Sequence, residues 1–217
     1  MSYFSPDFIE FFKELAANNN KDWFDVNRKR YENNVKKPFY RFVEDTISAL
    51  KKEDSDFDLD LKRAVFRINR DIRFSKDKSP YKLHMATALI NGGKKNMHTA
   101  GMYLQSSPEN FRIYQGLYMP EKSRIYEVRE RIAAQPRRWK KIISSAEFVE
   151  NYGEVQGEKN KIIPKEFKSA AEKEPFIFNK QWYIYTDLAP ETILREDILD
   201  FVMEKNRIAR DFNAFLN

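Results

Sequence analysis

The residues most able to do chemistry gather in one short stretch of the chain, residues 62–82. This stretch carries eight lysines and arginines and only two acids, Asp71 and Asp77. Guanidinium and ammonium groups at such density attract phosphate, sulfate or carboxylate. The alternative is a solvated basic turn whose arginines pair with acids on neighbouring strands. Six cations are the candidate ligand-binding residues: Arg67, Arg70, Arg73, Lys76, Lys78 and Lys82.

An extended strand is predicted over residues 64–74, because apolar and polar side chains alternate there. Alternation would place Arg70 on the apolar side of this strand, where burying an unpaired guanidinium is costly. We therefore expect Arg70 to be largely buried against an acid, a carbonyl or a bound anion. Asp71 is a poor partner, because neighbouring strand residues point to opposite faces. The predicted apolar side consists of Ala64, Phe66, Ile68, Ile72 and Phe74.

A turn is predicted after this strand, over residues 75–82, where Ser79 precedes Pro80. Proline fixes its own backbone and disfavours a helical conformation at the residue before it. Such a turn leaves main-chain N–H groups without helical partners, and these groups attract anions. We therefore expect the turn to hold an anion between its N–H groups, Arg73 and the neighbouring lysines.

The same residues carry a family resemblance. The string FRINRDIRFSKDKSPYK, with NNNKDWF upstream and GLYMP downstream, resembles the bacterial family called domain of unknown function 2461. The resemblance extends over nearly the whole chain, from about Phe8 to Phe215. It implies one intact domain of mixed helix and sheet, and it implies no activity, cofactor or catalytic residue.

The composition is that of a globular protein, with 33% charged and 41% hydrophobic residues. Aromatic residues are spread from end to end of the 217 residues, which favours a single domain over residues 1–217. The formal net charge of +6 is compatible with polyanionic partners but is also common in ordinary proteins. The start lacks a signal-peptide pattern and no apolar run approaches a membrane span, so we expect a cytoplasmic protein without a membrane partner. The sequence leaves the oligomeric state open.

Known catalytic and metal-binding patterns are missing from the sequence. The chain has no cysteine, which excludes disulfides and thiolate metal sites. The two histidines, His84 and His98, have no metal-ligand spacing with each other. Residues 54–65 lack the glycine and glutamate of a calcium loop, and residues 91–95 lack the spacing of a phosphate-binding P-loop. We therefore expect no metal and no cofactor, while acid–base catalysis by carboxylates stays open.

Strands are predicted at residues 84–90, 100–106 and 111–119, and residues 176–188 are strand-like. Amphipathic helices are predicted before these strands and at the chain end, with a long one over residues 198–215. This order predicts an α+β fold, in which an antiparallel sheet of four to six strands packs against helices from both ends of the chain. Helices over residues 120–153 are expected to cover one sheet face. The strand at 111–119 has one apolar face and a second face suited to floor a pocket, with Arg112, Tyr114, Gly116 and Tyr118.

Three functions remain after these exclusions. The first is recognition of a small anionic ligand, bearing phosphate or carboxylate, by the six cations. The second is a nucleic-acid-binding module, for which a further basic cluster at residues 137–141 would be relevant, although a helix surface most often carries such a cluster into solvent. The third is a metal-independent enzyme that uses the same cations on an anionic substrate. Tyr81, Tyr114 and Tyr118 are candidates for such a site, although strand tyrosines are more often core residues.

Overall fold

A four-stranded antiparallel sheet organises the structure, a computed structural model that describes residues 2–217. Its strands follow the chain in the order β1 (Met85–Leu89), β2 (Gly101–Ser106), β3 (Phe111–Leu117) and β4 (Trp182–Leu188). The alternating segments of the sequence therefore form the strands they predict, and the α+β fold with helices from both ends is confirmed. Residues 176–181 are an exception, because they precede β4 as a 3₁₀ turn, η4 (Pro175–Phe178), and a bend.

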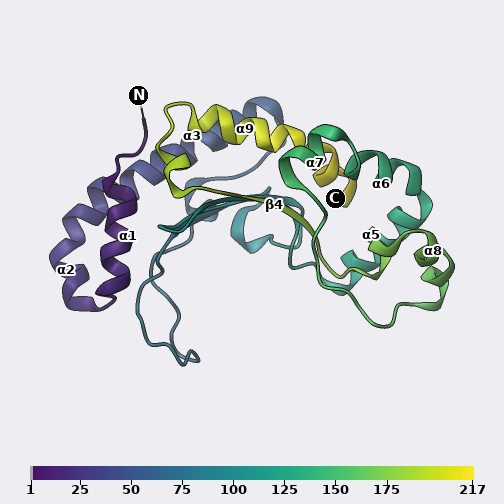
Figure 1. Ribbon diagram of the computed structural model, residues 1–217, viewed down its shortest axis with the longest axis horizontal. Coiled ribbons are helices and arrows are strands. Elements are labelled where there is room, and N and C mark those ends of the chain that lie inside the picture. The colour runs from purple at the N-terminus through teal and green to yellow at the C-terminus, as the bar shows by residue number, and fades with distance from the viewer. Residues whose placement is uncertain (1) are drawn as a thin grey trace.

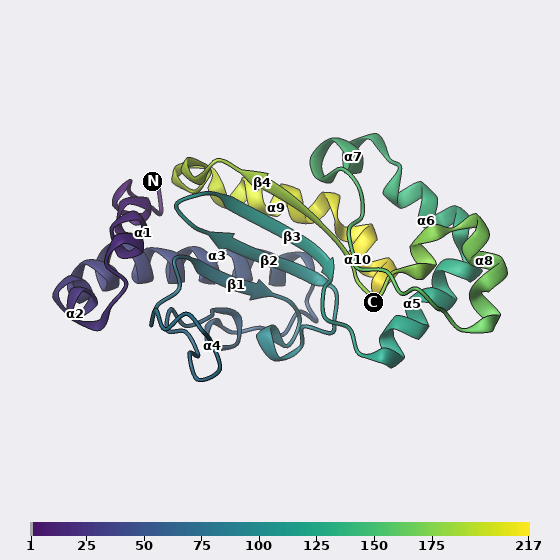
Figure 2. The same ribbon diagram turned by 60° about the horizontal axis from the view of Figure 1, so that its bottom comes forward.

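Helices cover one face of the sheet, the face that carries Leu104, Ile113 and Ile184. Figures 1 and 2 show α3 (Lys37–Glu53) and α9 (Ile198–Ile208) lying across this face. The chain continues from α9 into α10 (Arg210–Leu216), which packs on β3, so the predicted long C-terminal helix divides at Ala209. Every second residue of each strand points into the covered face, and most of these residues are apolar.

The N-terminal helices form an aromatic corner at one end of the sheet. They are α1 (Asp7–Ala17), α2 (Lys21–Arg30) and a π-helix, η1 (Tyr31–Lys36), that leads directly into α3. Asn20 begins α2 by accepting a hydrogen bond from the backbone N–H of Trp23. Phe11 contacts the rings of Trp23, Phe24 and Tyr31, with centroid distances of 5.6–6.2 Å. These contacts hold the corner together.

The helices between β3 and β4 lie beyond the other end of the sheet, so the prediction that residues 120–153 cover a sheet face is wrong (Figure 2). Their apolar sides bury Trp139 and Phe148 against Phe212 and Phe215 of α10 instead. This second hydrophobic cluster reaches the sheet only at its end, through Leu117, Trp182 and Ile184. We call the group the lobe: α5 (Lys122–Ala134), α6 (Pro136–Ile143), α7 (Ala146–Tyr152), η3 (Lys165–Phe167) and α8 (Lys168–Lys173).

The predicted strand over residues 64–74 is wrong as well. Residues Leu61–Ala64 form a short helix, α4, and only Val65 and Phe66 pair with the edge of β1. The chain then leaves the sheet as an extended loop, residues 67–82, which we call the arm (Figure 1). Phe74 at its far end is 96% exposed. The alternating pattern failed here because the outer half of the arm has no partner strand and no apolar layer to pack on.

Among residues 2–217, no helix lies on the second face of the sheet, and we call it the open face (Figure 2). The strand register places its side chains in rows across the strands. One row joins Tyr103, Tyr114 and Tyr185, and the next row joins Gln105, Arg112 and Asp187. The rows are about 7 Å apart, since they are two residues apart along each strand. The open face therefore combines aromatic and polar side chains on a rigid support.

The length of the helices indicates whether any of them could span a membrane. The longest, α3, has 17 residues, whereas a spanning helix needs about 20 apolar ones. Within residues 2–217, no helix has both the length and the apolar character that a bilayer span requires.

Gly116 on β3 tests how tightly the sheet is built below the open face. Its φ is +110°, and a Cβ there would lie 2.4 Å from the carbonyl oxygen of Trp182. Replacing Gly116 with alanine combines a disfavoured backbone conformation with overpacking, so we expect a loss of about 3 kcal/mol in unfolding free energy. Gly153 is the matched control, because it also has positive φ, +68°, but has open space around a Cβ. Gly153→Ala should cost about 1–2 kcal/mol less than Gly116→Ala, because it introduces backbone strain without overpacking. Equal losses in urea denaturation would contradict this account.

Candidate ligand-binding site

The structure separates the six predicted cations. Arg70 finds the partner that the sequence demanded, because its guanidinium pairs with Asp77 and donates to the carbonyl oxygen of Ser79 at 3.1 Å. Its side chain is 26% exposed, so it is only partly buried. Arg73 pairs with Asp71 at 2.7 Å and is 76% exposed. Both arginines therefore have carboxylate partners inside the arm.

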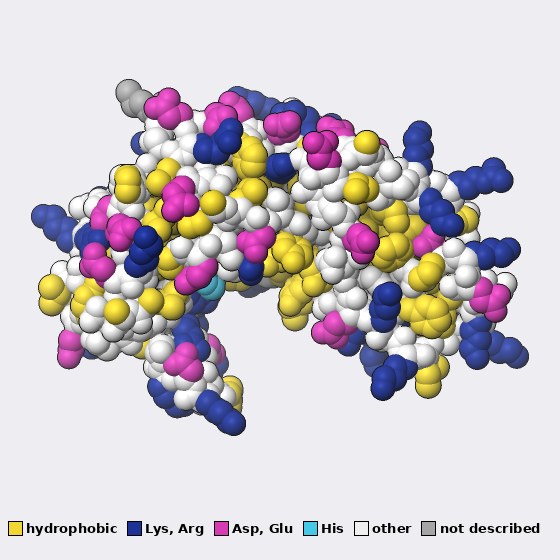
Figure 3. Space-filling model, in the orientation of Figure 1, with side chains coloured by type: hydrophobic (Ala, Val, Ile, Leu, Met, Phe, Trp, Pro, Cys, Tyr) yellow, Lys and Arg dark blue, Asp and Glu magenta, His cyan; other side chains and the backbone are white. Residues whose placement is uncertain are grey.

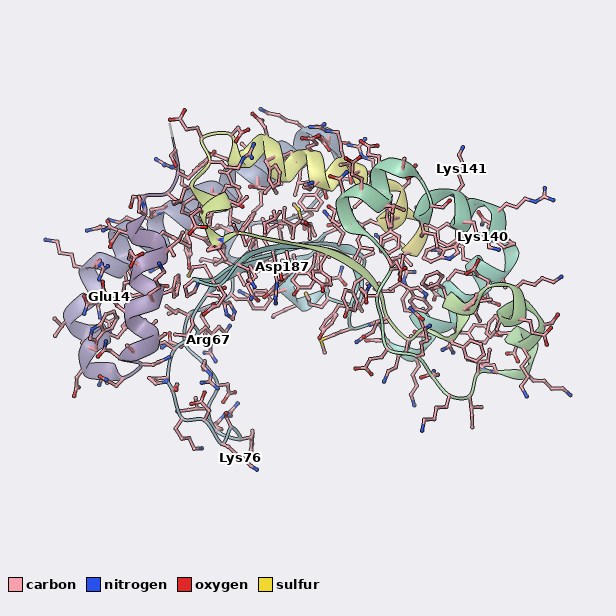
Figure 4. The ribbon with its side chains drawn as sticks, viewed as in Figure 1. Glu14, Arg67, Lys76, Lys140, Lys141 and Asp187 are labelled. Carbon is pink, nitrogen blue, oxygen red and sulfur yellow. The ribbon has the colours of Figure 1, made fainter. Side chains whose placement is uncertain are left out.

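Asp77 occupies the place where the turn was expected to hold an anion. Its carboxylate accepts hydrogen bonds from the backbone N–H of Ser79, at 2.9 Å, and from the Ser79 hydroxyl, at 2.6 Å. These hydrogen bonds, followed by the one from Arg70, hold the pKa of Asp77 well below its usual range. Asp77 thus supplies, from within the chain, the negative charge that the turn was expected to take from a ligand. Lys78 donates to the carbonyl oxygen of Ile72 at 3.0 Å, and Lys76 is exposed at the far end of the arm (Figure 4).

Lys82 lies at the base of the arm, beside the open face. Its ammonium is 5.4 Å from the centre of the Phe66 ring, which is itself 5.9 Å from the Tyr103 ring. No ion pair joins Lys82 to any residue that the structure describes. Partial burial, and then the nearby charges of Arg67 and Lys94, lower the pKa of Lys82. Lys82 therefore lies near other positive charges, and an anion bound beside it would reduce the repulsion between these cations.

The open face contains a cavity of about 400 Å³. Figure 3 shows the molecule hollowed between the arm and the lobe, and the cavity lies on the sheet there. Gly101 and Gly116 leave its floor without side chains, and the prediction that this face of β3 floors a pocket is confirmed. Its remaining lining is mostly aromatic and apolar: Ile90, Met97, Tyr103, Gln105, Tyr114, Gln115, Tyr118, Met119 and Tyr183.

The tyrosines around this cavity hold one another in place. Tyr114 stacks on Tyr185 at 5.3 Å and meets Tyr103 edge-on at 5.8 Å, and Tyr118 meets Tyr183 at 5.4 Å. Burial, with smaller contributions from the neighbouring hydroxyls, raises the pKa of Tyr103 to about 12. The hydroxyl of Tyr103 donates a hydrogen bond to Oε1 of Gln105 at 3.4 Å. Such rings offer flat apolar contact with polar tips.

The polar row of the open face continues from the tyrosines towards the arm. Arg112 pairs with Asp187 at 2.9 Å, and its Nε is buried without a hydrogen-bond partner in the described chain. Figure 4 shows Asp187 on the sheet between the arm and the lobe. Leu83 packs against the covered core, whereas the ammonium of Lys82 lies over the Phe66 ring. The open face is thus aromatic at one end and cationic at the other.

His84 lies near Lys82, and the sequence analysis considered it only as a possible metal ligand. The imidazole is mostly buried and has no hydrogen-bond partner among the described residues. Burial, and then the charge of Lys82, lower the pKa of His84 to about 4. Tyr103 and Tyr183 were missed for a different reason, because their place beside Tyr114 follows from the strand register.

The second basic cluster lies far from this site. Lys140 and Lys141 project from α6 in the lobe, well away from Lys76 at the tip of the arm (Figure 4). Arg67 is also separate from the open-face cavity. It lines a second cavity, between the arm and the N-terminal helices, together with Arg28, Lys36 and several aromatic residues. The cations of the sequence therefore serve different surfaces.

Comparisons with known proteins give a family for the chain. The family described as conserved hypothetical protein (DUF2461) matches residues 7–215. No curated protein and no solved structure matches the chain. The match covers nearly every element described above, including the arm, the sheet and the lobe.

The burial of His84 predicts a specific dependence of stability on pH. Its folded-state pKa of about 4 lies below the ordinary value of 6.5, so the unfolded chain binds a proton that the folded chain does not. The contribution is intact above pH 6.5 and is lost as the pH falls towards 4. Between pH 7 and pH 5, wild type should lose about 2 kcal/mol more unfolding free energy than His84→Gln.

Chemical denaturation at several pH values measures this difference. His98→Gln is the control, because His98 is exposed and should leave the pH dependence of wild type unchanged. Parallel curves for wild type and His84→Gln would show that His84 is not held neutral by the fold.

Proposed function

The chain belongs to the family described as conserved hypothetical protein (DUF2461). From the geometry of the open face, we propose that this protein binds a small anionic ligand that carries a flat ring. The ring lies on the tyrosines around Gly116, and the anionic group, phosphate or carboxylate, reaches towards Lys82. The observation that carries this proposal is the position of Lys82, a cation without a carboxylate partner next to an aromatic cavity.

Size and lining support a small ligand. A cavity of about 400 Å³ falls in the range of small-molecule sites, which typically combine apolar walls with a few polar groups. Stacking of a flat ring on an aromatic side chain contributes about 1–3 kcal/mol for a nucleic-acid base, and a smaller ring gains less. The Lys82 ammonium lies 5.4 Å from the centre of the Phe66 ring, and that ring centre lies 5.9 Å from the centre of the Tyr103 ring. One small molecule with a short linker between ring and anion can therefore contact both ends.

The charge distribution argues against a nucleic-acid module. Two of the six cations are neutralised within the arm, and the cluster on α6 lies at the far end of the molecule. A surface that tracks a phosphate backbone needs cations in a continuous path. Sub-micromolar binding of single-stranded or duplex nucleic acid at physiological salt, with a steep salt dependence, would replace the small-ligand proposal with this rival.

Calorimetric titration with three matched probes tests the small-ligand proposal. Phenyl phosphate carries both the ring and the anion, glycerol phosphate lacks the ring, and phenol lacks the anion. We expect phenyl phosphate to bind at least about tenfold more tightly than either partial probe, since each half should contribute about 1.4 kcal/mol or more. Equal affinity for phenyl phosphate and glycerol phosphate would contradict a role for the tyrosines.

Two pairs of variants locate the binding. Lys82→Gln should weaken phenyl phosphate about tenfold, because a charge-assisted contact is lost, whereas Lys76→Gln at the arm end should bind like wild type. Tyr118→Ala should weaken it roughly fivefold to tenfold, through loss of ring contact. Tyr126→Ala is its control, because Tyr126 is similarly exposed but lies on α5 in the lobe. If the controls lose as much as the test variants, the open face is not the site.

A further inference from the structure

A second cavity, of about 270 Å³, lies between the N-terminal helices and the base of the arm. It differs from the open-face cavity in its lining, which is as polar as it is apolar. Arg28 and Glu32 come from α2 and η1, Arg67 and Asn69 come from the arm, and the full lining is Phe24, Arg28, Tyr31, Glu32, Lys36, Tyr40, Arg67, Ile68, Asn69 and Tyr81. No residue lines both cavities.

The wall between the arm and the helical corner is fixed by Tyr81. Its ring stacks on Phe24, with a centroid distance of 4.0 Å and an interplanar angle of 18°. Its backbone exchanges two hydrogen bonds with the Asn19 side chain, at 2.9 and 3.1 Å. Asn69 pairs with Tyr81 across the base of the arm. The base of the arm is therefore anchored, and the cavity has preformed walls.

The opposite wall is a π-helix, η1 (Tyr31–Lys36). Its wider turn, with i→i+5 hydrogen bonding, brings residues five apart towards the same side, and both Tyr31 and Lys36 line the cavity. π-helical segments are rare and are frequently found at functional sites. The unusual backbone and the cavity thus coincide.

The charges of the cavity are unbalanced in favour of cations. Lys36 pairs with Glu32 at 2.9 Å, and Arg28 pairs with Asp25 outside the cavity. Arg67 has no ion pair or hydrogen bond to any described residue. Three further polar groups in the lining have no side-chain hydrogen bond within residues 2–217: the hydroxyls of Tyr40 and Tyr81 and the amide of Asn69.

We propose that this cavity is a second ligand site, which binds a small oxyanion, a carboxylate or phosphate group, through Arg67. A guanidinium binds such an anion with two parallel hydrogen bonds, and the hydroxyl groups of Tyr40 and Tyr81 supply further donors. The volume suits a small acid and is too limited for a large ring system together with its anionic group. The site does not depend on the open face, because neither Lys82 nor the tyrosine rows belong to its lining.

Calorimetric titration with inorganic phosphate and with succinate, at constant ionic strength, tests this site. Arg67→Gln should weaken binding at least about tenfold, since a bidentate charged contact is lost, and Tyr40→Phe should weaken it about threefold. Arg73→Gln is the matched control, because Arg73 lies in the same arm and pairs locally with Asp71. It should bind like wild type, and Lys82→Gln should lose clearly less affinity than Arg67→Gln, because Lys82 acts on Arg67 only through its nearby charge. Circular dichroism of each variant checks that the fold is intact.

Three outcomes would overturn the second site. One is that wild type binds neither probe more tightly than roughly 10 mM. Another is that Arg67→Gln binds like wild type, or that Arg73→Gln loses as much as Arg67→Gln. The third is that Lys82→Gln loses binding while Arg67→Gln does not, which would assign the small anion to the open face. Failure of phenyl phosphate binding, with phosphate binding lost in Arg67→Gln, would instead remove the open-face proposal and leave the second site in place.

Discussion

The structure depends on a sheet that is covered on one face only. Side chains such as Leu104 and Ile113 point into the helical layer, and the register then forces the alternate residues onto the open face. A purely charged set of residues there would make an ordinary solvated face. This chain instead places Tyr103, Tyr114 and Tyr185 in one row, beside a row in which Gly101 and Gly116 have no side chains. The uncovered aromatic face, with the arm on one side and the lobe on the other, is what makes a ligand site possible.

The elements that could be predicted were those in which the periodic spacing of apolar residues alone determines which side faces the core. The strands and the helix through Phe39, Phe42 and Leu50 follow from periodicity, because each presents one apolar face to a continuous core. The arm and the lobe could not be predicted in the same way. Phe74 fits an alternating strand, but no partner strand reaches it, and Trp139 fits a helix that could pack on a sheet or on α10. Long-range packing decides such cases, and periodicity does not contain it.

The candidate site was predicted in part. The charge of the arm and the need of Arg70 for a partner were visible in the sequence, but the partner, Asp77, lies seven residues away across a turn. The pocket face of β3 followed from alternation. Its completion by Tyr183 requires the β3–β4 register, across the whole lobe insertion. The divergence of Lys82 and Arg67 towards two cavities depends on where the arm leaves the sheet.

The central claim is that a ring-bearing anion binds on the open face, and amide chemical-shift mapping with phenyl phosphate tests it most directly. The account predicts that the largest shifts fall on Tyr103, Tyr114 and Gly116, with smaller ones at Lys82, because these residues surround the cavity and its cationic end. The amides of Lys76 and of α6 should stay unchanged. Shifts confined to the end of the arm or to the lobe, or no shifts on β2 and β3, would contradict the account.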